Sequence, residues 1–183
     1  MKRIFIAADI RQDIREIIYK FAQRNFSYSD NTRLIIAENL HITFKFLGNT
    51  PDKEIFCIKE TIKKSVSGFG YFKYCLEDSI GAFPDKRRAR ILFIGIEEGR
   101  EKFKELHSSI ETGLDRMGIV KDSRSFYPHI TFARMSPALS IEEGSIRRGP
   151  VPTALKCSRI SLYESILGAE RVKYINIGRF SLK

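Results

Sequence analysis

The sequence is poor in the residues that build disulfide frameworks and metal sites. Its three cysteines, Cys57, Cys75 and Cys157, form no Cys-x-x-Cys pair, which argues against a disulfide framework and against a cysteine-based zinc site. The chain has three histidines and no carboxylate–histidine cluster to accompany them. We therefore expect no metal ion and no other cofactor.

Long hydrophobic runs are also absent. No stretch approaches the roughly 18 apolar residues that a membrane-spanning helix requires. The first apolar run, residues 4–8, is cut short by Asp9 and Arg11, so it predicts a first strand in place of a signal peptide. We expect a soluble, cytoplasmic protein without a membrane partner.

Acidic residues are in deficit. The chain has 32 Lys and Arg against 22 Asp and Glu, a formal net charge of +10, which favours a polyanionic partner such as nucleic acid. Its 183 residues, 43% of them hydrophobic, can bury one core. We expect one domain over residues 1–183 that works as a monomer.

The tetrapeptide His-Ile-Thr-Phe occurs twice, at His41–Phe44 and at His129–Phe132. Side chains alternate along a strand, so each histidine shares a face with the threonine two residues later, while Ile and Phe point to the opposite face. Two such strands facing each other would place two imidazoles and two hydroxyls around one anionic group. That arrangement suits general acid–base chemistry on a phosphodiester.

Each motif residue has a candidate role. Histidine titrates near neutral pH, so His41 and His129 can divide the roles of acid and base. The hydroxyls of Thr43 and Thr131 can donate hydrogen bonds to phosphate oxygens. The third histidine, His107, lies outside the repeated pattern and is interpreted as structural.

Two cations follow the motifs. By strand alternation Lys45 should face the cleft with His41, and we expect it to bind phosphate. Arg134 falls on the opposite face unless the strand bends or bulges after Phe132.

The spacing of apolar residues outside the motifs predicts alternating strands and helices. The expected strands cover residues 4–10, the second apolar cluster of 33–47, and residues 71–76, 89–96, 126–135, 154–162 and 171–180, the last two forming a hairpin. The expected helices cover residues 13–21, 52–65 and 101–117. Both halves read as strand, helix and motif-bearing strand, which indicates an internal duplication with both motifs near an approximate two-fold axis.

The motifs and the segments around them resemble those of the 2H phosphoesterase superfamily. The surrounding sequence is similar to its RNA 2′,3′-cyclic phosphodiesterase branch, also called the 2′-5′ RNA ligase or ThpR/LigT family. The similarity covers most of the chain, in family order, over residues 3–7, 38–48, 83–96 and 126–134.

The resemblance implies a bilobal α+β fold, with two antiparallel sheets flanking a central cleft and helices packed outside. It implies metal-independent hydrolysis of a terminal 2′,3′-cyclic phosphate to a 2′-phosphomonoester, with reversible 2′-5′ ligation of tRNA halves as a side activity. If the family's roles hold for the matching residues here, His41 protonates the leaving 3′-oxygen, His129 activates water, and Arg134 contacts phosphate or nucleotide. Because the site is nearly symmetric, the residues themselves leave open which histidine is acid and which is base.

Three alternatives remain open at this stage. A 2′-5′ oligonucleotide phosphodiesterase of the same superfamily would use the same residues. A basic RNA-binding module with a vestigial site would bind RNA without turnover. A metal-dependent hydrolase would lose its activity in EDTA.

Overall fold

The computed structural model describes residues 1–27, 31–141, 154–168 and 171–183. The strands are β1 (Lys2–Ala8), β2 (Thr32–Leu34), β3 (Ile42–Thr50), β4 (Phe72–Tyr74), β5 (Leu76–Phe83), β6 (Ala89–Ile96), β7 (His129–Leu139), β8 (Leu155–Cys157), β9 (Arg159–Leu167) and β10 (Val172–Ser181). The α-helices are α1 (Gln12–Phe26), α2 (Ile55–Val66) and α3 (Arg100–Asp115), and short 3₁₀ turns cover Ala37–Asn39, Asp52–Glu54 and Lys86–Arg88.

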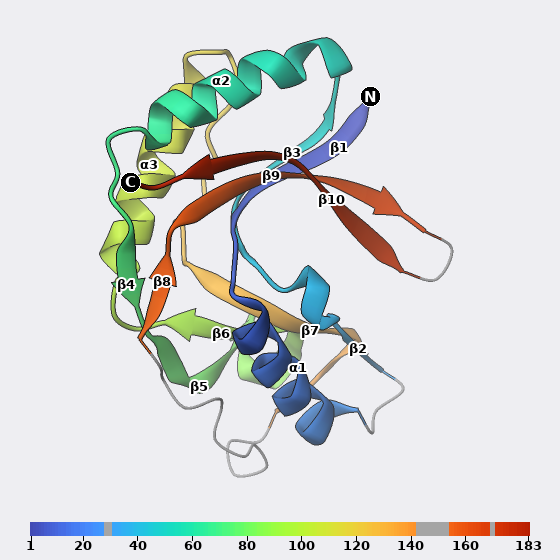
Figure 1. The fold of residues 1–183 in the computed structure, drawn as a ribbon. Coiled ribbons are helices and arrows are strands. Elements are labelled where there is room, and N and C mark those ends of the chain that lie inside the picture. The colour runs from blue at the N-terminus through green and yellow to red at the C-terminus, as the bar shows by residue number, and fades with distance from the viewer. Residues whose placement is uncertain (28–30, 142–153, 169–170) are drawn as a thin grey trace.

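An antiparallel sheet runs through the molecule in the order β10-β9-β1-β3-β7-β6-β5, with β2 beside β7 (Figure 1). Strands β4 and β8 form a separate two-stranded sheet. The predicted α+β fold is confirmed. The two predicted sheets are continuous with each other, because β3 pairs with β7 at one position, Ile42 opposite Ile130.

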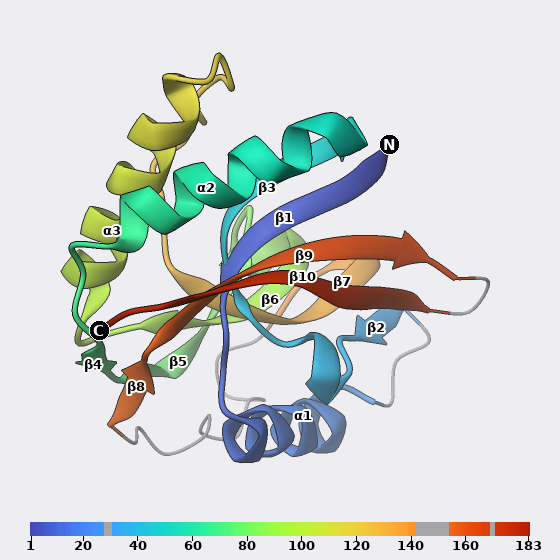
Figure 2. The ribbon, with the colours of Figure 1, turned by 45° about the horizontal axis from the view of Figure 1, so that its top comes forward.

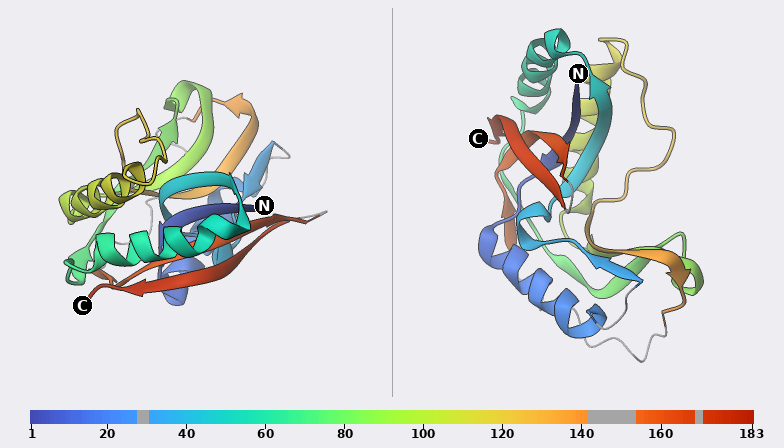
Figure 3. Two further views of the ribbon diagram at one scale, coloured as in Figure 1. Left: turned by 90° about the horizontal axis from the view of Figure 1, so that it is seen from above. Right: turned by 90° about the vertical axis from the view of Figure 1, so that its right-hand side faces the viewer.

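The helices pack by the apolar stripes that the sequence predicts. Helix α3 buries Phe103, Leu106, Ile110 and Leu114, at steps of three and four residues that place them on one face. It lies side by side with α2 (Figure 3). Helix α1 lies instead against β2 and β7 (Figure 2).

Each motif phenylalanine packs against a helix from the other half of the chain. Phe44 of β3 lies 6.0 Å, between ring centroids, from Phe103 of α3. Phe132 of β7 lies 5.8 Å from Phe21 and 5.5 Å from Phe26, at the end of α1. The chain segments before and after residue 70 therefore share one core, to which each contributes a helix that covers the other's motif strand.

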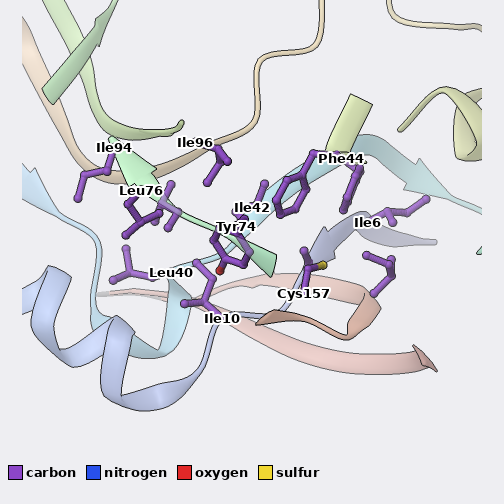
Figure 4. Packing of buried hydrophobic residues seen from close by; sticks show 14 of the residues in the cluster. Ile6, Ile10, Leu40, Ile42, Phe44, Tyr74, Leu76, Ile94, Ile96 and Cys157 are labelled. Carbon is purple, nitrogen blue, oxygen red and sulfur yellow. The ribbon is translucent and has the colours of Figure 1, made fainter. Parts of the chain in front are cut away.

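The core side of the motif strands is fully apolar. Ile42, Ile130 and Phe132 are 0% exposed and Phe44 is 3% exposed. Figure 4 shows Ile42 and Phe44 among buried side chains from β1, β4, β5, β6 and β8. The predicted alternation is confirmed, since the histidine and threonine of each motif lie on the other, partly exposed face.

Both motif strands are irregular at the same place. In β3, Thr43 and Lys45 pair with the consecutive residues Ala7 and Ile6 of β1. In β7, Thr131 and Ala133 pair in the same way with two consecutive residues of β6. An extra residue on one strand is a β-bulge, which reverses the alternation beyond it.

The bulge in β3 overturns the expectation that Lys45 faces the cleft. Lys45 is 3% exposed, and its Nζ donates hydrogen bonds to Glu111 Oε1 of α3 at 2.7 Å and to the Val120 carbonyl at 3.0 Å. Its ammonium therefore belongs to a buried ion pair on the side of the sheet that α3 covers.

Three predicted segments differ in extent. The hairpin predicted from residue 154 begins later, at β9, because the extended strand is interrupted at Ser158. The residues before Ser158 form β8, which pairs with β4. Strand β7 starts at His129 and runs to Leu139, so it is shifted toward the C-terminus of the predicted 126–135. The strand predicted at 71–76 is divided into β4 and the beginning of β5, and β5 continues to Phe83.

The ion pair gives a stability prediction. Replacing Lys45 with Met leaves Glu111 buried without its cation, and removing one partner of a buried pair costs about 3–5 kcal/mol. Urea denaturation should show that loss for Lys45→Met. The matched variant Lys63→Met, on the exposed face of α2, should stay within about 0.5 kcal/mol of the unmodified protein. Equal stability of the two variants would contradict the buried pair.

Candidate active site

The two motif histidines are held in the same way. His41 Nδ1 lies 2.7 Å from the carbonyl of Asn39, and His129 Nδ1 lies 2.6 Å from the carbonyl of Tyr127. A carbonyl can only accept a hydrogen bond, so each Nδ1 carries the proton. In the neutral ring Nε2 then keeps its lone pair, and among the described residues it has no hydrogen-bond partner, so each histidine can use this nitrogen for proton transfer.

The carbonyls that orient the histidines are anchored in turn. Asn39 donates from Nδ2 to the carbonyl of Val172 on β10 at 2.8 Å. Tyr127 donates its hydroxyl to Glu77 at 2.7 Å, and Arg100 donates to the same carboxylate at 2.5 Å. Since a histidine is only as fixed as its partner, these contacts position both imidazoles.

Burial sets the protonation state of the pair. Burial, together with smaller effects of the positive charges of His129 and Arg134, lowers the pKa of His41 to about 4. Burial and Arg134 also lower the pKa of His129. Both imidazoles are therefore neutral at pH 7 in the free protein. The two rings lie on neighbouring strands, because the residues that follow them, Ile42 and Ile130, pair with each other.

The motif threonines lie on the same face as their histidines. Thr43 and Thr131 are both partly exposed, and neither hydroxyl forms a hydrogen bond with the described residues. Each hydroxyl can therefore donate to an anion held between the histidines.

Aromatic rings border both histidines. Phe5 lies 4.9 Å from the His41 ring and Tyr174 lies 5.4 Å from it. Phe93 and Phe83 lie 4.9 Å and 5.3 Å from the His129 ring. These rings desolvate the imidazoles. Phe5 and Phe93 are buried, whereas Phe83 is exposed and Tyr174 partly exposed, so the latter two rings suit stacking on a base.

Arg134 is on the histidine face because of the bulge in β7. Phe132 and Ala133 are both buried, and Arg134 after them is exposed. The strand therefore bulges after Phe132, as the sequence required if Arg134 was to face the histidines. In the first half, the bulge places Phe46 at the same step after its histidine, 61% exposed and 5.8 Å from the Phe5 ring. Lys45 corresponds by register to buried Ala133, and it lies away from this face.

His107 lies outside the site. Its ring stacks on Phe126 at 4.1 Å, and its Nε2 lies 3.6 Å from Glu111. This agrees with the structural role expected of it.

Several site residues carry no signal in the sequence. Phe46 and Tyr174 are ordinary strand aromatics, and Asn39 and Tyr127 act on the histidines through backbone carbonyls, which every residue has. The common spacing of two residues before each histidine could have pointed to Asn39 and Tyr127.

Within the described ranges, no group of three or more His, Cys, Asp or Glu side chains could hold a metal ion. No helix in the same ranges is long and apolar enough to cross a membrane.

Curated proteins with similar sequences share one name. The RNA 2′,3′-cyclic phosphodiesterase of Methanocaldococcus jannaschii is 34% identical over 133 residues, which cover 73% of this chain and 71% of that protein. The RNA 2′,3′-cyclic phosphodiesterase of Escherichia coli K12 is 27% identical over 185 residues, covering 99% and 97%. The predicted enzyme class, a phosphodiesterase, agrees with these names.

Solved structures show the same fold. Escherichia coli LigT complexed with 3′-AMP superimposes with a TM-score of 0.83 at 23% identity, covering 99% of this chain and 98% of that one. A second structure, described as a phosphoesterase, gives a TM-score of 0.85 at 23% identity. The model of the 2′-5′ RNA ligase superfamily matches residues 9–168, and the chain belongs to that superfamily, as its paired motifs predict.

Proposed function

We propose that this protein is an RNA 2′,3′-cyclic phosphodiesterase that opens a terminal cyclic phosphate to a 2′-phosphomonoester without a metal ion. The observation that carries the proposal is the matched pair of histidines, each with Nδ1 hydrogen-bonded to a backbone carbonyl and Nε2 left free. The names of the relatives support the same substrate class.

The proposed reaction uses the two free Nε2 atoms. Neutral His129 takes a proton from a water molecule as the water oxygen bonds to phosphorus. Protonated His41 gives its proton to the 3′-oxygen as the bond from phosphorus to that oxygen breaks. In the ligation that we propose as a side activity on tRNA halves, the 5′-hydroxyl of a second strand takes the place of water. His129 takes the proton of that hydroxyl as its oxygen bonds to phosphorus, and the bond from phosphorus to the 3′-oxygen breaks, so that a 2′-5′ phosphodiester forms; the reverse of this step cleaves the 2′-5′ bond.

The negative charge of the substrate explains how His41 becomes an acid. In the free protein burial keeps its pKa at about 4. A phosphate bound beside the ring favours the charged imidazolium. Thr43, Thr131 and Arg134 would stabilise the negative charge that develops on the phosphate oxygens, Arg134 by an ion pair and the hydroxyls by hydrogen bonds.

We further propose that residues 1–183 form one domain of two lobes related by an approximate two-fold axis. The pairing of Ile42 with Ile130, which are equivalent positions of the two motifs, supports such an axis. The matching bulges after the motifs support it as well. The same proposal includes a monomer that acts in the cytoplasm.

Hydrolysis should be resistant to EDTA and should depend on both histidines. A short RNA ending in a 2′,3′-cyclic phosphate should yield the 2′-phosphate, identified by phosphorus NMR. Because a positioned proton transfer supplies about 100- to 10,000-fold, His41→Ala and His129→Ala should each lower kcat/KM by that range. His107→Gln, the matched control, should change it by less than about twofold. Loss of activity in EDTA, or a 3′-phosphate product, would contradict the proposal.

The pH profile of kcat/KM reports the histidines of the free enzyme. Since both pKa values lie below 6.5, the rate should be highest between pH of about 4 and 6.5 and should fall as pH rises above that window, because the acid loses its proton. It should also fall below the window, where the base is protonated.

The same profile assigns the roles. If His41 is the acid, His41→Ala should lose the decrease on the alkaline side, and His129→Ala should lose the decrease on the acidic side. The opposite pattern would exchange the two roles, and an unmodified enzyme that is most active above pH 7.5 would contradict the lowered pKa values.

A further inference from the structure

A cavity of about 350 Å³ opens beside the histidine pair. Its walls come from α1, β2, the segment 35–39, β7 and the first residues of β10 (Figure 2). The apolar part includes Leu34, Ile35 and Val172, and the charged part is three arginines, Arg33, Arg134 and Arg171. No carboxylate is among the described residues that line it, so the cavity carries a strong, uncompensated positive charge.

Two of these arginines face each other directly. Arg33 of β2 and Arg134 of β7 are register partners in antiparallel strands, and the Cβ atoms of such partners lie about 4.5–5.5 Å apart on one face. Both side chains are exposed, and neither forms an ion pair or hydrogen bond with the described residues. Like charges placed directly opposite each other destabilise a sheet, and an anion bound between them would remove that cost.

The cavity adjoins the reacting centre through two of its lining residues, Asn39 and Arg134. The charge of Arg134 acts on both His41 and His129. Asn39, which also lines the cavity, supplies the carbonyl that holds His41. The charges of Arg134, Arg3 and Arg33 all act on Tyr174, which borders His41. A strand whose cyclic phosphate lies between the histidines can therefore pass Arg134 and reach Arg33.

We propose that the cavity binds the phosphodiester that precedes the terminal nucleotide, with Arg33 and Arg134 on either side of it, so that the enzyme selects RNA strands over mononucleotides. This inference rests on the proposed function. The size fits, because pockets of about 300–1,000 Å³ hold small ligands. Arginine forms paired, charge-assisted hydrogen bonds with phosphate, and the apolar wall offers contact to the adjoining sugar and base.

The test compares three substrates that share the reacting group. They are cytidine 2′,3′-cyclic phosphate, the dinucleotide CpC ending in a 2′,3′-cyclic phosphate, and the same dinucleotide with a neutral methylphosphonate in place of its internal phosphodiester. The unmodified enzyme should prefer the charged dinucleotide over the other two by about 10- to 100-fold in kcat/KM, the range of a charge-assisted hydrogen bond. Arg33→Ala should lose most of that preference and should hydrolyse the mononucleotide within about twofold of the unmodified rate.

The mononucleotide rate also shows that the variant is folded. Arg116→Ala carries the same change of charge in the groove between α2 and α3, and it should keep the full preference. The inference is overturned if Arg33→Ala slows all three substrates equally, or if the methylphosphonate dinucleotide reacts as fast as the charged one. If the unmodified enzyme hydrolyses none of the three, the proposed function itself fails.

Discussion

One backbone pairing joins the two halves of the sheet, that of Ile42 on β3 with Ile130 on β7. Each residue directly follows a motif histidine, so the junction of the sheet and the centre of the site coincide. Both isoleucines are fully buried, and their burial keeps His41 and His129 on the opposite, open face. The helices strengthen the junction, because α1 packs on Phe132 and α3 packs on Phe44.

The two bulges give the symmetric strands different chemistry. Each bulge turns the next but one residue after the motif phenylalanine toward the histidines, Phe46 in one strand and Arg134 in the other. The site is therefore symmetric in its histidines and threonines and asymmetric around them. Phe46 adds an exposed ring after one motif, and Arg134 adds an exposed cation at the equivalent position after the other.

The cations behind the net charge of +10 differ in whether a carboxylate neutralises them. Lys45 is neutralised by Glu111 inside the fold, and Arg100 is neutralised by Glu77. Arg33 and Arg134 instead face each other across neighbouring strands without a carboxylate. Like charges on register partners oppose folding, and a bound anion would relieve that cost, as in the proposed phosphodiester site.

The sequence by itself determined which residues share a face in each motif, because His41, Thr43, His129 and Thr131 stand in a repeated tetrapeptide with a two-residue alternation. It also determined the α+β class and the apolar stripes of the helices. Only the tertiary structure decided where Lys45 and Arg134 point, because a single inserted residue reverses alternation and leaves no mark in composition. The same holds for Arg33 and for the carbonyls of Asn39 and Tyr127, whose roles arise from contacts between segments distant in the chain.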